Sequence, residues 1–375
     1  MATLTKLAVP MNDLGIQHRQ LQAEMDAALA EVIQRCSFIL GPQVQAFEEA
    51  FAAYCGTRYC VGVSNGTDAI KLVLAALGIG PGDEVITTPH TFGATVEGIL
   101  QVGARPVLAD IDRRYFTLDP EQVERSLTPR TRAVLPVHIY GQMADMDALE
   151  ALAQDRGVAV VEDAAQAQGA RCRGRRAGAA GRAACFSFFP GKNLGAYGDA
   201  GGITTSDDAL ATRLRSLRNH GQDPRKKFFY EELGYNHRMD GLQGAVLKVK
   251  LPHLDDWNEK RRAIAARYDA GLGDLPQVRV PEVAPWAEHV YHLYVVRVPD
   301  REALGADLKE CGIATAVQYP LPLHLTPAYA SLGYGPGSLP ACEEACRQII
   351  SLPMFPDLTE AQVEHVIDRV RRHYA

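Results

Sequence analysis

Between residues 62 and 205, hydrophobic positions follow two alternating patterns. In one, apolar residues recur at helical spacing, as Ile70, Val73, Leu74 and Leu77 do at i, i+3, i+4 and i+7. In the other, short continuous runs are rich in β-branched residues and predict strands that are buried on both faces. These runs lie at 61–63, 85–87, 106–110, 133–138 and 158–163.

This alternation predicts an α/β fold with a mostly parallel central sheet and helices on both faces. In such a sheet, ligands collect at the carboxyl ends of the strands. Thr67, His90 and Asp163 each follow one of the predicted strands or end it. We therefore expect these three side chains at the same edge of the sheet.

A different arrangement begins near residue 251. Apolar residues from Leu254 to Leu272 trace one face of a long helix, and residues 289–298 form a predicted strand. A capping box at Thr359–Gln362 begins a last helix. We predict two domains, a large one at 1–250 that includes an N-terminal arm and a smaller α+β domain at 251–375. The length of 375 residues fits two domains.

Composition narrows the classes of partner. The net charge is -6 and no long basic run is present, which argues against nucleic acid. The basic cluster at 171–176 is mixed with Gly and Cys, and we interpret it as a solvated loop. The apolar runs are shorter than the ~20 residues of a membrane span, and the N-terminus lacks the order of a signal peptide. We expect a cytoplasmic protein with no membrane partner.

The eight cysteines show no spacing typical of a zinc site or a disulfide framework. Cys342 and Cys346 lie one helical turn apart, and Cys55 and Cys60 flank a turn. We interpret both pairs as reduced packing residues and expect no metal site.

Two segments carry the strongest chemical signal. An apolar run ends in Asp163, and a later one delivers Ser187 and then Lys192, which lies between Gly191 and Gly195. This order suits pyridoxal phosphate (PLP), because a lysine amine can form a Schiff base with its aldehyde while an acid pairs with its pyridine nitrogen. The alternative for Asp163 is a helix cap, and for Lys192 a surface position.

Further residues could hold the same cofactor. In the segment 64–69, Gly66 and Thr67 stand where a strand meets a helix, a suitable place for a phosphate, although a plain helix cap is the alternative. Ser187 is a second phosphate candidate. Gln166 follows Asp163 by three residues and could contact the ring hydroxyl. Phe92 could stack on the ring, or belong to the core.

With these motifs, the chain resembles the DegT/DnrJ/StrS group of PLP-dependent sugar aminotransferases, which have the aspartate-aminotransferase fold (fold type I). The resemblance covers nearly the whole chain. The segments that carry it are 39–42 with 47–48, 64–69, 89–92, 162–166, 186–195 and 234–238.

The resemblance implies a role for each matched residue. Lys192 would be the Schiff-base lysine and Asp163 the partner of the pyridine nitrogen. The remaining cofactor-binding positions would be Gly66, Thr67, Asp68, Phe92, Gln166, Ser187 and Asn236. Family members place the Asn236 position against the phosphate of the neighbouring subunit, which implies a homodimer with shared active sites. Arg238, also from the neighbouring subunit, would bind the carboxylate of the amino donor.

Family reactions convert a nucleotide-linked ketosugar to an aminosugar, usually with L-glutamate as donor. Asp240 and the loop from Tyr319 to His324 resemble members that act at C-3 rather than C-4, so Tyr319 and His324 are predicted to bind substrate. His237 departs from the family pattern. A keto-cyclitol substrate, or a PLP-binding regulator without turnover, are the alternatives.

Overall fold

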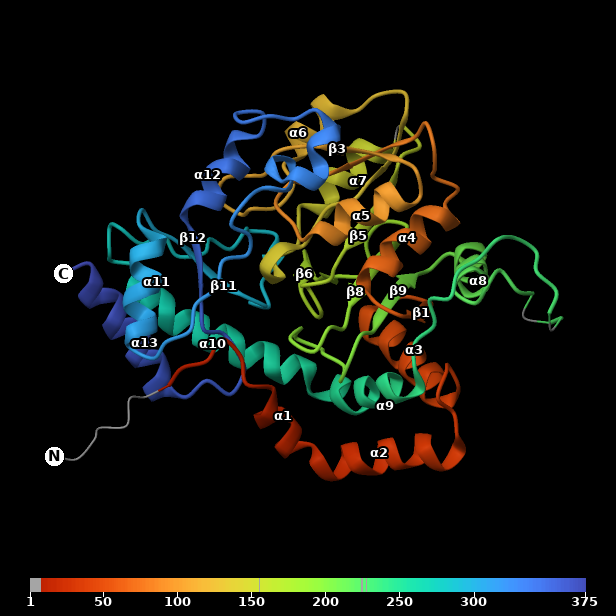
Figure 1. The fold of residues 1–375 in the computed structure, drawn as a ribbon, viewed down its shortest axis with the longest axis horizontal. Coiled ribbons are helices and arrows are strands. Elements are labelled where there is room, and N and C mark those ends of the chain that lie inside the picture. The colour runs from red at the N-terminus through yellow and green to blue at the C-terminus, as the bar shows by residue number, and fades with distance from the viewer. Residues whose placement is uncertain (1–7, 155, 224, 227) are drawn as a thin grey trace.

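The computed structural model describes residues 8–154, 156–223, 225–226 and 228–375. At its centre lies a seven-stranded sheet in the order β1-β9-β8-β5-β4-β2-β3 (Figure 1). β9 runs antiparallel to both of its neighbours, and the other adjacent pairs are parallel. The strands are β1 (Tyr59–Val63), β2 (Glu84–Thr87), β3 (Arg105–Leu108), β4 (Thr131–Val134), β5 (Ala159–Asp163), β8 (Ala183–Ser187) and β9 (Gly201–Thr205). The predicted α/β class with a mostly parallel sheet is confirmed.

Helices cover both faces of this sheet. Val160 and Val161 are neighbours on β5, yet they belong to different cores because successive side chains of a strand point to opposite faces. Val160 packs in the core of α3, α7 and α9, and Val161 in the core of α4 and α8. The helices are α1 (Leu14–Gln20), α2 (Gln22–Arg35), α3 (Pro42–Cys55), α4 (Gly66–Ala76), α5 (Gly93–Gln101), α6 (Pro120–Ser126), α7 (Met146–Gln154), α8 (Asp208–Leu217), α9 (Gly241–Lys250), α10 (Leu254–Leu272), α11 (Arg301–Glu310), α12 (Pro340–Gln348) and α13 (Glu360–His373).

β4 is shorter than the run predicted at 133–138. The backbone stays extended beyond Val134, and Val137 pairs with Asp163 as an isolated parallel bridge. Pro136 interrupts the ladder because it has no N–H to donate, although its carbonyl accepts from the Asp163 amide at 2.9 Å. The extended backbone after β4 therefore still pairs with Asp163, the last residue of β5.

A separate core forms around β11 (Tyr294–Arg297) and β12 (Ile349–Leu352), with α11 and α13 packed on it. Figure 1 shows α10 running from the region of α9 to this second core. Leu254, at the start of α10, lies in the same core of the large sheet as Val160, whereas Ile264 lies in the second core. Val9 also packs there, although the predicted boundary assigns it to the first domain. The division at residue 250 remains a prediction.

The strand predicted at 289–298 is wrong in its first half. His289 Nδ1 accepts a hydrogen bond from the Tyr291 amide at 2.9 Å, and Tyr291 has a φ of 43°. This local turn replaces strand pairing until Tyr294. The capping box of Thr359 and Gln362 is present as predicted. No helix in the described ranges combines the length and apolarity needed to cross a membrane.

Candidate active site

Asp163 ends β5 and is only 4% exposed. Its Oδ2 accepts a hydrogen bond from Thr95 Oγ1 at 2.7 Å, and its Oδ1 accepts one from the Ala165 amide at 3.2 Å. Burial raises the pKa of Asp163, and these hydrogen bonds offset only part of the rise. The carboxylate is therefore held in place and would be stabilised further by a cation or a protonated nitrogen.

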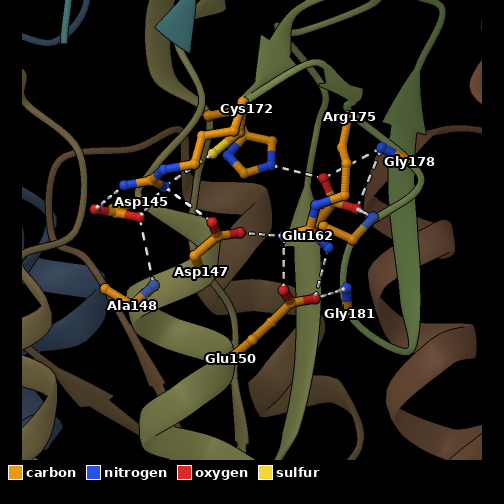
Figure 2. A network of polar contacts seen from close by, with 12 residues as sticks. Asp145, Asp147, Ala148, Glu150, Glu162, Cys172, Arg175, Gly178 and Gly181 are labelled. Atoms are coloured by element: carbon orange, nitrogen blue, oxygen red, sulfur yellow. Dashed lines mark hydrogen bonds and ion pairs between the residues drawn. The ribbon is translucent and has the colours of Figure 1, made fainter. Parts of the chain in front are cut away.

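Glu162 precedes Asp163 and is buried on the opposite side of β5. Its carboxylate accepts hydrogen bonds from His138 Nε2 at 2.9 Å and from the amides of Gly178 and Ala180 (Figure 2). Every partner comes from a segment that borders the strand, so Glu162 fixes the strand end that carries Asp163. The sequence analysis missed this role.

The basic cluster at 171–176 is not the solvated loop that we predicted. It forms the hairpin β6 (Arg171–Cys172) and β7 (Arg175–Arg176), which continues into the turn at Gly178. Arg175 pairs with Asp147 at 2.5 Å and with Glu150 at 2.8 Å on α7 (Figure 2). These ion pairs hold the hairpin against α7, beside the carboxylate of Glu162.

Lys192 lies on the loop after β8 and is half-buried. Its amide donates to the Phe189 carbonyl at 2.8 Å. Gly195 permits the tight turn, because a Cβ there would lie 2.2 Å from the Pro190 carbonyl oxygen. Burial lowers the pKa of Lys192 to about 8, and the nearby charge of Asp163 opposes this fall. The two predicted catalytic residues thus act on each other electrostatically.

The start of α4 approaches the same loop. Gly66 packs so close to Ser187 that a Cβ would lie 2.8 Å from the Ser187 Cβ. Asn65 caps the helix by accepting from the Asp68 amide at 2.8 Å. The amides of Gly66 and Thr67 belong to the first turn, where no intrahelical acceptor exists. The structure therefore brings Gly66, Thr67 and Ser187 together at a helix N-terminus suited to an anion.

Asp68 holds a neighbouring segment. Its Oδ2 accepts hydrogen bonds from Ser64 Oγ and Asn65 Nδ2 and lies 3.1 Å from His237 Nδ1. Burial opposes ionisation, but the hydrogen bonds from His237 and Ser64 prevail and lower the pKa of Asp68. His237, which departs from the family pattern, therefore fastens the segment 234–240 to the start of α4.

A third group joins the large sheet to the loop at 319–324. Gln166 Oε1 accepts from the Tyr140 amide at 2.7 Å, and Gln166 Nε2 donates to the Tyr319 hydroxyl at 3.4 Å. Phe92 is 61% exposed and its ring centroid lies 6.0 Å from that of Tyr319. An exposed ring of this size at the N-terminus of α5 remains available to stack on a planar ligand.

The remaining predicted residues lie on other contacts. Asn236 is exposed and bridges to Asn219, and Arg238 Nη1 donates to Asn219 Oδ1 at 3.2 Å. His324, predicted to bind substrate, contacts an acid of α12, and its substrate role stays a prediction. Its side chain is buried, and Nε2 lies 3.2 Å from a carboxylate oxygen of Glu343 on α12.

Comparison with known proteins decides the family. The model of the DegT/DnrJ/EryC1/StrS aminotransferase family matches residues 19–371. The chain belongs to this family. It is therefore an aminotransferase, and the resemblance drawn from the motifs is confirmed.

Two relatives are similar to this aminotransferase over nearly its full length. The dTDP-3-amino-3,4,6-trideoxy-alpha-D-glucose transaminase of Streptomyces venezuelae is 50% identical, over 97% of this chain and 95% of its own. A pleiotropic regulatory protein of Geobacillus stearothermophilus is also 50% identical, over 98% of both chains.

Solved structures agree with the fold. S. venezuelae DesV in complex with a ketimine intermediate superposes with a TM-score of 0.95 at 50% identity, covering 97% of this chain and 98% of the other. NtdA of Bacillus subtilis with bound cofactor PMP gives 0.88 at 32% identity, covering 95% and 82%. The predicted PLP fold type I is confirmed by these neighbours.

The environment of Lys192 predicts an unusual pH profile. When no aldehyde is bound to the protein, the rate at which an acylating reagent labels Lys192 should rise as the pH passes about 8, because only the neutral amine reacts. Asp163→Asn should move the midpoint to lower pH, since the carboxylate charge raises the pKa of Lys192. Peptide mass spectrometry after pulse labelling measures both.

Lys250 is the internal control. Its pKa is also lowered to about 8 by burial, but it is 3% exposed and donates to the Gly195 carbonyl, so it should stay unlabelled. A Lys192 profile that rises only near the ordinary lysine value of about 10.4 would contradict the proposed environment.

Proposed function

We propose that this protein transfers an amino group from L-glutamate to a nucleotide-linked 3-ketosugar with pyridoxal phosphate as cofactor. The observation that carries the proposal is the placement of Lys192 beside the buried carboxylate of Asp163. The relative from S. venezuelae is named for a 3-amino sugar, and B. subtilis NtdA was solved with PMP, the aminated form of this cofactor.

The donor set fits the cofactor. Gly66, Thr67 and Ser187 form a cradle at a helix N-terminus, into which a Cβ on Gly66 could not fit, and this suits the phosphate. The carboxylate of Asp163 suits the pyridine nitrogen, and Phe92 suits the ring face. We assign Asp68 to positioning this cradle, since its carboxylate is already occupied by His237, Ser64 and Asn65. When bound, the cofactor supplies an aldehyde for the amino group and a ring that withdraws electrons from the substrate carbon.

Lys192 has two tasks in this proposal. Its amine, with a pKa lowered to about 8, is neutral in a much larger share of molecules near neutral pH than an ordinary lysine, and this neutral form would anchor the cofactor. Once released, the same Nζ would accept the proton from the α-carbon of glutamate and pass it to the cofactor carbon that takes up the nitrogen. In the second half-reaction it would take a proton from that carbon and give it to the sugar carbon that gains the amine. Asp163 keeps a proton on the pyridine nitrogen, and Thr95 and Ala165 keep the carboxylate aimed.

The substrate residues follow from the loops around this centre. Gln166 holds Tyr319 at the mouth of the site, where we place the sugar. His324 supports the same loop through its contact with Glu343. Arg238, which in the homodimer proposed below would come from the other chain, offers a guanidinium that can bind the glutamate carboxylate in bidentate fashion.

Two other functions share parts of this chemistry. One is a regulator that binds the cofactor without turnover, and the Geobacillus relative is named as a regulatory protein. A non-reacting binder would not need an amine with a lowered pKa beside a buried acid, and this favours the enzyme. A keto-cyclitol aminotransferase would use the same cofactor residues, so only substrate tests separate it.

The test is conversion of defined ketones by the holoenzyme with L-glutamate, followed by mass spectrometry. We expect the amine from nucleotide-linked 3-ketosugars, and little from 4-ketosugars or keto-cyclitols. Asp163→Asn should retain cofactor yet lower kcat by at least about 100-fold, because the protonated nitrogen matters most in the transition state. Asp256→Asn, on the exposed face of α10, is the matched control and should leave kcat unchanged.

Outcomes can separate the candidates. Transfer of the amino group from glutamate to the cofactor, with no ketone aminated afterwards, would contradict the sugar assignment. A cofactor that does not react with glutamate would favour the regulator. Amination of a free keto-cyclitol in preference to nucleotide sugars would favour the cyclitol enzyme.

We further propose a homodimer whose two sites each use Asn236 from the other chain. Apolar side chains are exposed close to this segment and on the arm before α3: Leu233 is 93% exposed, Phe229 52% and Ile39 51%. Exposed apolar side chains grouped in this way are typical of a contact with another protein surface.

Mixed dimers test the shared site. Lys192→Ala and Asn236→Ala chains, each impaired alone, should together regain about a quarter of wild-type activity, because a heterodimer has one site with both lesions and one intact site. Lys192→Ala mixed with Asp163→Asn is the control and should regain none, since both residues serve the same chain's site. Confirmed subunit exchange without recovery in the first mixture would exclude sharing through Asn236.

A further inference from the structure

In the interior of the protein, a histidine lies next to two cysteines that are far from it in the sequence. His90 follows β2, and Cys342 and Cys346 lie one turn apart on α12. All three are at most 1% exposed. His90 Nδ1 lies 3.7 Å from Cys342 Sγ and 3.6 Å from Cys346 Sγ, and the two sulfurs are 4.0 Å apart. Among the residues that the structure describes, this is a group of ligand atoms compact enough to hold a metal ion.

The histidine is oriented for coordination. Tyr140 donates its hydroxyl proton to the Gln318 carbonyl at 2.5 Å, so the same oxygen must accept from His90 Nε2, 2.6 Å away. This hydrogen bond fixes the proton on Nε2 and leaves the lone pair of Nδ1 directed at the sulfurs. Metal-bound histidines generally have the second ring nitrogen held in this way.

The helix that carries the cysteines is held independently. Asp110, after β3, accepts hydrogen bonds from the amides of Ala341 at 2.8 Å and Cys342 at 2.9 Å. The positions of the two sulfurs therefore depend on the backbone rather than on mutual contact.

Size and charge indicate which ion fits. The nearest point equidistant from the three atoms lies about 2.2 Å from each, between the lengths of zinc–nitrogen and zinc–sulfur bonds. Nitrogen and thiolate ligands favour Zn²⁺ over magnesium or calcium. Two thiolates and a neutral imidazole also cancel the charge of a divalent ion, which matters in a site without solvent.

We propose that His90, Cys342 and Cys346 bind one Zn²⁺ ion that fastens α12 to the loop after β2. The described residues include no fourth His, Cys, Asp or Glu in the group, so a water molecule or another small ligand would complete the tetrahedron. The ion lies outside the reaction centre but close to its frame. Phe92 is two residues beyond His90, and the Tyr140 amide donates to Gln166. Zinc here would restrain both the ring-stacking residue and Gln166.

The test is metal analysis of the purified holoenzyme. The protein is expressed in medium that contains zinc and is then separated from free metal in reducing buffer. We expect about one zinc ion per chain. Cys342→Ala and Cys346→Ala should each reduce zinc to the buffer background. Cys60→Ala is the matched control: this cysteine is equally buried, at 1% exposed, lies away from the three ligands, and should leave the zinc content unchanged.

Measurements on the unmodified protein keep the proposal testable if a variant fails to fold. Replacing zinc with Co²⁺ should give sulfur-to-cobalt absorption in the near ultraviolet, and removing the metal should lower the Tm, with recovery on adding Zn²⁺. Wild-type protein without zinc after reconstitution, zinc retained in both cysteine variants, or a Cys342–Cys346 disulfide in the native protein would each overturn the proposal.

Discussion

A carboxylate buried at the end of a parallel strand is the constraint on which the rest of this structure depends. Removing the charge of Asp163 from water is unfavourable unless donors and a cation surround it. Thr95 and the Ala165 amide supply the donors, and Lys192 supplies the cation. The same burial lowers the pKa of Lys192, which is the direction that the proposed nucleophile requires. It raises the pKa of Asp163, and a protonated pyridine nitrogen beside the carboxylate would oppose that rise.

Positions this critical need rigid support from both sides. Glu162 fixes the far face of β5 through His138 and the turn after β7. Beneath the lysine loop, Phe51 packs edge-on against Phe186 and Phe188, with ring centroids 4.9 and 5.2 Å away. The Phe188 amide donates to the Ala200 carbonyl, and the Phe188 carbonyl accepts from the Ala196 amide. The aromatic cluster is thereby bonded to both ends of the loop that carries Lys192, and it fixes the position of that loop.

The fold class and the two residues Asp163 and Lys192 can be predicted from the sequence because both depend on local patterns. Continuous apolar runs indicate parallel strands, and Asp163 and Lys192 follow two of them at recognisable motifs. Partners recruited from distant segments leave no such signal. Nothing in the sequence around Thr95 or His138 marks either as a support of the acids on β5. The predicted strand at 289–298 failed because the His289 side chain bonds the Tyr291 amide and bends the chain. Cys342 and Cys346 were interpreted as packing residues because their neighbour His90 is separated from them by most of the chain.

The central claim is that Lys192, lying beside Asp163, is the residue that holds the cofactor. Reduction of the purified holoenzyme with borohydride, followed by proteolysis and mass spectrometry, tests it directly, because reduction makes the lysine–cofactor bond permanent. The account predicts a pyridoxyl group on Lys192 and on no other lysine. A pyridoxyl group on another lysine, or a protein that binds pyridoxal phosphate with no covalent attachment, would contradict it.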